Sequence, residues 1–139
     1  MKRSATLYRK SKDGKIAFFI DDINAQAIYN FLSEDKANLK KFRYVLELLL
    51  EGRPPRDLYD KENIDKNCKN VSAIKLFKGI KNPRIYCQHY KSDKTMLYII
   101  VAVELLVKKK SNRNSRNEIG IIRRVASYKY TLKDGINIY

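Results

Sequence analysis

The sequence has little of what most metal and enzyme sites are built from. Among its 139 residues are one histidine, His89, and two isolated cysteines, Cys68 and Cys87. A zinc site takes four nitrogen or sulfur ligands at short spacings, and no such set is present. The two cysteines favour free structural thiols over a disulfide in a reducing compartment. The chain also lacks a glycine-rich phosphate loop, a nucleophile elbow and a His–Asp pair, so no metal and no cofactor are expected.

Long hydrophobic runs are missing as well. The longest, Met96–Val103, has eight residues, whereas a membrane-spanning helix needs about 20. The N-terminal stretch Met1–Lys15 is polar and basic, with no apolar segment of the kind that follows the start of a signal peptide. These absences predict a cytoplasmic protein without a membrane partner.

Acidic residues are scarce, and this is the strongest signal in the composition. Thirty Lys and Arg stand against fifteen Asp and Glu, a formal net charge of +15. Residues 70–139 alone carry 15 basic and 4 acidic groups, a net +11. Such an excess opposes compaction by self-repulsion and usually serves a polyanionic partner. Nucleic acid is the favoured partner; an anionic membrane surface and a basic surface without a specific partner are the alternatives.

Hydrophobic patterning predicts one α+β domain over residues 1–139. Helical spacing of Leu39, Phe42, Leu46 and Leu49 indicates a core-facing helix, expected to be capped by Ser33. Alternation and apolar runs in the second half indicate an antiparallel meander, and Ser115 to Glu118 has the form of a capping box. The predicted elements are an N-terminal β-hairpin (5–20), a helical hairpin (22–51), a polar connector (56–70), a sheet (71–107), a helix (116–128) and a short C-terminal tail (131–139).

Basic residues and tyrosines gather on and after the predicted sheet, and they suffice for one class of reaction. RNA carries its own nucleophile, the ribose 2′-hydroxyl, beside the scissile phosphate. An enzyme has to move protons and stabilise the phosphorane charge, for which the arginine fork is suited. Crowded cations lower the pKa of a neighbouring lysine or tyrosine, so a histidine pair is not required. The simpler interpretation is that these cations only bind backbone phosphate.

The order of several short motifs resembles the RelE/HigB superfamily of toxins, in particular its phage-derived host-killing branch. The motifs are a lysine-bearing strand, Ile74-Lys75-Leu76-Phe77-Lys78-Gly79, then Asn82-Pro83-Arg84-Ile85-Tyr86-Cys87, a long apolar strand ending in Leu106-Val107-Lys108-Lys109-Lys110, and a helix followed by tyrosines. The likeness runs from about Ile28 to Tyr130. The N-terminal hairpin and the connector are longer than a minimal toxin needs, and Leu106 stands where an aromatic often precedes the lysine pair.

The resemblance implies a RelE-like microbial-RNase fold: an antiparallel twisted sheet of about four strands, an N-terminal α-hairpin on one face and a short C-terminal helix. It also implies metal-independent cleavage of mRNA, commonly on the ribosome, and neutralisation by a cognate acidic antitoxin. Arg84 matches the family's strand arginine at the scissile phosphate. The catalytic candidates are Arg84, Lys75, Lys78, Arg124, Tyr128 and Tyr130, and the RNA-binding candidates are Lys81, Lys108, Lys109, Lys110, Arg113, Arg116 and Arg123.

Two other functions stay open from the sequence. One is a non-catalytic protein of the same fold that binds RNA or the ribosome. The other is a basic DNA-binding regulator, because the helix at 116–127 carries Arg116, Asn117, Arg123 and Arg124. Arg84 also has a structural alternative, as the partner of a carboxylate such as Glu104.

Overall fold

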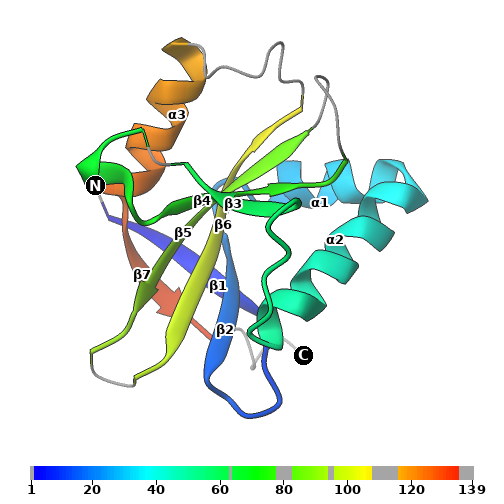
Figure 1. Cartoon of the computed structure of the whole chain (residues 1–139), viewed down its shortest axis with the longest axis horizontal. Coiled ribbons are helices and arrows are strands. Elements are labelled where there is room, and N and C mark those ends of the chain that lie inside the picture. The colour runs from blue at the N-terminus through cyan, green and yellow to red at the C-terminus, as the bar shows by residue number, and fades with distance from the viewer. Residues whose placement is uncertain (1, 63, 78–82, 94–95, 108–115, 135–139) are drawn as a thin grey trace.

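A seven-stranded mixed sheet forms the centre of the protein (Figure 1). The computed structural model describes residues 2–62, 64–77, 83–93, 96–107 and 116–134. Its elements are β1 (Lys2–Lys10), β2 (Ile16–Asp21), α1 (Ala25–Glu34), α2 (Lys36–Leu50), β3 (Tyr59–Lys61), the 3-10 helix η1 (Lys66–Cys68), β4 (Val71–Lys75), β5 (Arg84–Lys91), β6 (Tyr98–Leu106), α3 (Arg116–Ser127) and β7 (Lys129–Lys133). The strand order across the sheet is β3-β4-β5-β6-β2-β1-β7.

The predicted fold, with about four antiparallel strands and an N-terminal α-hairpin, is wrong. The β1–β2 hairpin opens the chain and belongs to the same sheet, because β2 pairs in parallel with β6. Part of the polar connector forms β3 at one edge, and part of the expected C-terminal tail forms β7, which pairs in parallel with β1 at the other. A strand covered on both faces has a near-continuous apolar run, and β6, which has one, lies inside the sheet between β5 and β2.

Helices cover the two faces of this sheet in separate groups (Figure 1). On one face α1 and α2 contribute Ile28, Phe42 and Leu46 to a core that also contains Phe18 of β2. On the other face α3 packs Ile121, Ile122 and Val125 against the strands. We call these the α2 face and the α3 face.

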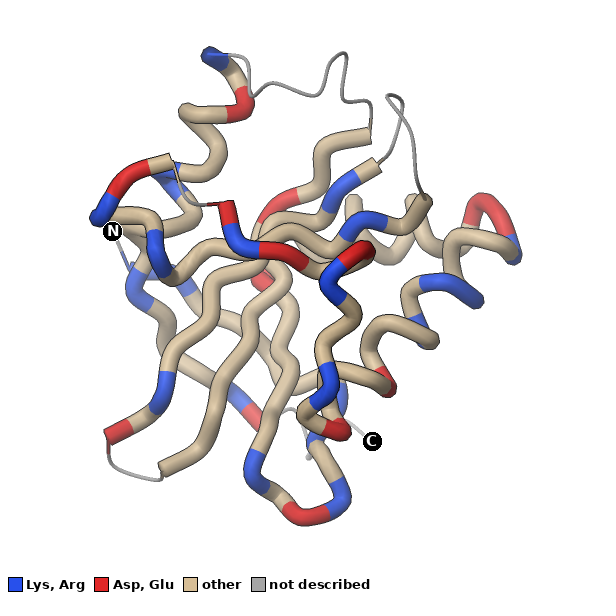
Figure 2. Tube along the Cα trace, in the orientation of Figure 1, with Lys and Arg blue, Asp and Glu red and all other residues tan. Residues whose placement is uncertain are grey.

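Charge along the sequence does not correspond to two separate surfaces. Strands from the first half of the chain, β1 and β2, lie between β6 and β7 from the second half. Figure 2 accordingly shows Lys and Arg on α2, on the β1–β2 turn and on strands from both halves. Within the described ranges, no helix is long and apolar enough to cross a membrane.

Candidate functional site

Two of the predicted catalytic residues lie directly opposite each other on neighbouring strands. Lys75 of β4 pairs in register with Arg84 of β5, and the next residues on the same face of the sheet, Ala73 and Tyr86, also form a pair. Ala73 and Tyr86 are part of the core beneath α3. Side chains of directly opposed residues share a face, with Cβ atoms roughly 4.5–5.5 Å apart. Lys75 and Arg84 therefore form a two-cation patch on the α3 face.

A buried carboxylate neutralises Arg84. The Nη1 atom of Arg84 lies 2.9 Å from Oε1 of Glu62, and the two side chains are only 13% and 10% exposed. Glu62 directly follows the edge strand β3, and its backbone N–H donates a hydrogen bond to the carbonyl of Val71, the first residue of β4. Arg84 thus has a structural role of the kind weighed in the sequence, but its partner is Glu62 and not Glu104.

Two donors on β5 have no acceptor among the described residues. They are the buried Nε of Arg84 and the hydroxyl of Tyr86, whose side chain is fully enclosed. Burial raises the pKa of Tyr86, and the nearby Glu62 carboxylate adds to this rise. The hydroxyl is therefore protonated at neutral pH and is a hydrogen-bond donor. Unsatisfied buried donors are rare in folded proteins.

Arg124 is held by a different carboxylate on the same face. Its Nη2 lies 2.6 Å and its Nε 3.2 Å from the two carboxylate oxygens of Glu104 on β6. These hydrogen bonds raise the pKa of Arg124. Glu104 is paired in register with Tyr86, so it lies diagonally across from Arg84, at roughly 7–8 Å between such neighbours. Arg84 and Arg124 therefore flank Tyr86, each bound to its own carboxylate.

The two C-terminal tyrosines have different surroundings. The hydroxyl of Tyr130 donates a hydrogen bond of 2.6 Å to Asp21, a fully buried carboxylate that also binds Arg3 at 2.8 Å. Burial and this hydrogen bond raise the pKa of Tyr130. Tyr128 instead lies with its ring 4.3 Å from the guanidinium carbon of Arg3. Tyr130 is therefore held at the end of β2 by its hydrogen bond to Asp21, whereas no described side chain hydrogen-bonds the Tyr128 hydroxyl.

The remaining predicted residues fall into two groups. On α3, Arg116 is exposed, and Arg123 lies 3.6 Å from Asp65 with its side chain 66% exposed. The others lie outside the described residues: Lys78, Lys81, Lys108, Lys109, Lys110 and Arg113. Ser115 of the predicted capping box lies outside them as well.

Sequence reasoning missed three members of the site, namely Glu62, Arg3 and Asp21. Glu62 sits in the connector, where mixed charge concealed a strand. Asp21 had a usable signal, since it ends the apolar run Ile16-Ala17-Phe18-Phe19-Ile20 and is followed by a helix. An acid in that position is enclosed at the sheet end, and a buried carboxylate requires partners.

The histidine and the cysteines lie apart from this site. Burial, with a smaller contribution from Lys61, lowers the pKa of His89 to about 4, so the ring is neutral at physiological pH. Burial alone raises the pKa of Cys87, and burial is also the main cause of the raised pKa of Cys68. No group of three or more His, Cys, Asp or Glu in the described part of the chain is arranged to hold a metal ion.

Comparisons with protein-family models, with curated proteins and with solved structures found no match for this chain.

Proposed function

We propose that this protein binds RNA on the α3 face of its sheet and cleaves it, as the toxin of a toxin–antitoxin pair. The observation that supports the proposal most strongly is the pair of cations Lys75 and Arg84, opposed on neighbouring strands, with the Arg84 Nε lacking an acceptor among the described residues. A phosphodiester supplies acceptor oxygens for the Arg84 guanidinium and negative charge for both cations. The formal charge of +15 supports the same class of partner.

The proposed reaction uses the nucleophile that RNA provides. The 2′-oxygen forms a bond to the scissile phosphorus, the bond from phosphorus to the 5′-oxygen breaks, and a 2′,3′-cyclic phosphate and a free 5′-hydroxyl result. Arg84, held rigidly on a central strand, stabilises the charge of the phosphorane. The proton of the 2′-hydroxyl passes to a solvent water as another proton reaches the leaving 5′-oxygen. Tyr128, near Arg124, is the proposed tyrosine acid of the two C-terminal candidates.

Before RNA binds, Glu62 holds the Arg84 side chain in one position. Its carboxylate binds Arg84 as one phosphate oxygen would, so entry of RNA exchanges one anionic partner for another. The proposed substrate is mRNA on the ribosome, and the proposed location of the protein is the cytoplasm. The proposed antitoxin carries an acidic segment, because it has to cover the cations that RNA uses.

A second function, RNA binding without cleavage, has one specific observation in its favour. Arg84 and Arg124 are each already paired with a carboxylate, Glu62 and Glu104. If these pairs persist with RNA bound, the α3 face attracts RNA by its positive charge but has no free arginine to stabilise the phosphorane. The same experiment distinguishes the two functions.

The test is primer extension on a reporter mRNA in a bacterial translation extract, with wild type, Glu62→Met, Arg84→Met and the double variant. Loss of a charge stabiliser typically costs about 10²–10³-fold in rate, so both Arg84 variants should lose cleavage, whereas Glu62→Met should retain it. RNA affinity should stay within about threefold in all four proteins, because one contact among many is lost.

The double variant is the matched control, since it removes both charges of the Arg84–Glu62 pair. Circular dichroism verifies that each variant is folded. Full cleavage by a folded double variant would remove Arg84 from the mechanism. RNA binding with no cleavage by wild type would establish the non-catalytic function. Affinity should fall at least about 100-fold between 50 and 200 mM salt if six phosphates are contacted, and a flat response would refute both.

A further inference from the structure

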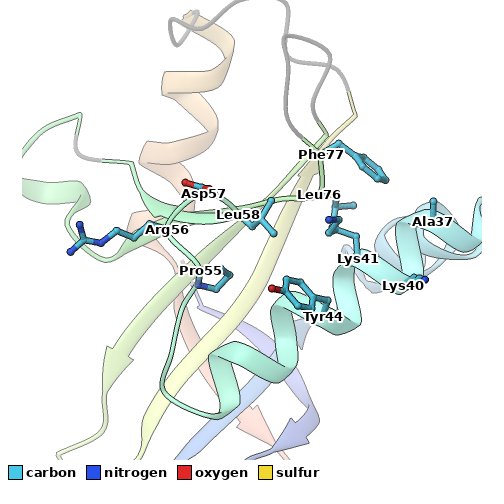
Figure 3. A pocket seen from close by; sticks show the side chains of 10 residues that line it. All are labelled: Ala37, Lys40, Lys41, Tyr44, Pro55, Arg56, Asp57, Leu58, Leu76 and Phe77. Atoms are coloured by element: carbon cyan, nitrogen blue, oxygen red, sulfur yellow. The ribbon is translucent and has the colours of Figure 1, made fainter.

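A groove of about 930 Å³ opens on the α2 face, away from the candidate RNA site. One wall is the outer side of α2, and the other is the segment 55–58, which leads from α2 toward β3. Figure 3 shows the Tyr44 ring on α2 pointing toward Pro55, with Leu58 between the walls and Phe77 at the far end. We call this hollow the α2 groove.

The base of the α2 groove is apolar, although the groove is open to solvent. Leu58 and Leu76 form its base and are 9% and 0% exposed. Tyr44 is 54% exposed, while its neighbours Phe42 and Val45 are fully enclosed on the core side of the same helix. A half-exposed aromatic over an apolar hollow is typical of a docking surface, where such residues serve as anchors.

Positive charge lines the helical wall of this groove. Lys40 and Lys41 precede Tyr44 by four and three residues, so all three lie on one side of α2. The Lys41 ammonium is 5.8 Å from the centre of the Tyr44 ring. No acid occurs in α2 before Glu47, and among the described lining residues Asp57 is the only acid. An occupant therefore has to bring its own negative charge.

We propose that the α2 groove binds an acidic, amphipathic segment of a partner protein. An aliphatic or aromatic side chain of that segment enters between Tyr44 and Leu58, and its carboxylates face Lys40 and Lys41. This is the helix-in-groove mode, in which apolar anchors recur at helical spacing. A nucleic acid fits less well, because the apolar base of the groove, Leu58 and Leu76, gives its phosphates no partners, and protein–DNA interfaces are more polar.

This site is independent of the proposed RNA chemistry. Lys75 and Leu76 are adjacent in the chain, yet Lys75 shares the α3 face with Arg84 and Leu76 belongs to the core beneath α2. Successive residues of an extended chain point to opposite faces. A partner in the α2 groove and an RNA on the α3 face can therefore be bound at the same time.

The test is a selection from a library of random 16-residue peptides against the full chain at 150 mM salt, with counter-selection against Tyr44→Ser. Tyr44 is exposed, so this substitution leaves the core intact. Selected peptides should be enriched in Asp and Glu and should carry aliphatic or aromatic residues three or four positions apart. Failure to obtain any peptide that distinguishes wild type from Tyr44→Ser overturns the proposal, and so does enrichment of basic or uncharged sequences.

Affinities of a selected peptide then locate its carboxylates. Fluorescence anisotropy should show at least about tenfold weaker binding to the double variant Lys40→Glu/Lys41→Glu, a loss of about 1.4 kcal/mol. Lys36→Glu/Arg43→Glu is the matched control, an equal total change of charge on the same helix at two exposed positions outside the groove. It should weaken binding less than about threefold. Equal losses in both variants overturn the proposal, as does displacement of the peptide by a single-stranded RNA whose own affinity depends on Lys40 and Lys41.

Discussion

The two faces of the sheet differ in what their helices enclose. Under α1 and α2 the core is apolar, with Phe42 packed edge-on against Phe18 at 5.9 Å between ring centroids. Under α3 apolar residues share the interface with buried charges, among them the Arg84–Glu62 pair. Buried ion pairs contribute little net stability, and apolar residues of similar volume are often as stable or more so. The α2 face is therefore built for stability, and the α3 face retains charge that stability does not require.

Truncation of the apolar core should have the largest effect. Phe42 is fully enclosed and contacts the rings of Phe18 and Tyr8 edge-on. Phe42→Ala removes this packing and leaves a cavity, so the free energy of unfolding should fall by about 4 kcal/mol. Urea denaturation measures it. Tyr44→Ala on the same helix is the control and should cost under about 1 kcal/mol. Similar losses in both would mean that α2 does not pack as described.

Local patterns in the sequence predicted the core of the α2 face. Leu39, Phe42, Leu46 and Leu49 recur at helical spacing, and all four pack toward the core of the observed helix. Only the cap differed, because Asp35 and not Ser33 accepts the hydrogen bond from the backbone of Ala37. The spacing of apolar residues along a single helix depends only on nearby residues, so the sequence alone can predict it.

The edge strand β7 and the pairing of β2 with β6 could not be predicted in the same way. Residues 71–75, 84–91 and 98–106 form strands within the predicted sheet region. By contrast, β7 is short, alternates weakly, and is stabilised by pairing with β1, more than 120 residues away. The parallel β2–β6 pairing is equally non-local. Strand partners depend on tertiary contacts that a single sequence does not show.

The sequence predicted the basic residues of the candidate site but not its acidic residues. Lys75 and Arg84 lie together as neighbouring basic strands suggested. Glu62 and Asp21 were overlooked, because a carboxylate reveals its role only when burial and a partner are known. The basic excess therefore drew attention to one sign of charge on a face that contains both.

Breaking the buried pair on the α3 face should have the next largest effect. Arg84→Met removes the Arg84 ion pair of the buried Glu62, and loss of one member of a buried pair costs about 3 kcal/mol or more. Glu62→Met/Arg84→Met should recover stability to within about 1 kcal/mol of wild type, because methionines fill similar volume without charge. Chemical denaturation of both variants measures this. A double variant as unstable as Arg84→Met alone would mean that the pair itself holds β3 and β5 together.

A histidine on the α2 face predicts a dependence on pH. Burial lowers the pKa of His89 to about 4, below about 6.5 in an unfolded chain. Between these values the unfolded state binds more protons, so the free energy of unfolding should decline as pH falls from about 6.5 to about 4. Allowing for partial exposure, the decline should be roughly 2 kcal/mol.

The variant His89→Phe isolates this contribution from that of the carboxylates. It should keep the acid-induced loss caused by carboxylate protonation and lack the part due to the imidazole. Urea unfolding at half-unit steps of pH compares the two proteins, and Tyr98, stacked on His89 at 6.1 Å, should accommodate the new ring. If wild type and His89→Phe lose stability equally as pH falls, the pKa of His89 is the same in the folded and the unfolded state.

The smallest expected effect separates the two C-terminal tyrosines. Tyr130 donates one of several hydrogen bonds that Asp21 accepts, the others coming from Arg3 and from the backbone of Ile23 and Asn24. Because Asp21 keeps those partners, Tyr130→Phe should cost about 1 kcal/mol of stability and leave RNA cleavage unchanged. Tyr128→Phe should do the opposite, with stability within about 0.5 kcal/mol and cleavage reduced. Thermal denaturation and primer extension on both proteins measure the two readouts. Loss of cleavage in Tyr130→Phe alone would transfer the proposed acid to the Asp21 cluster and move the reaction toward the β1–β7 edge.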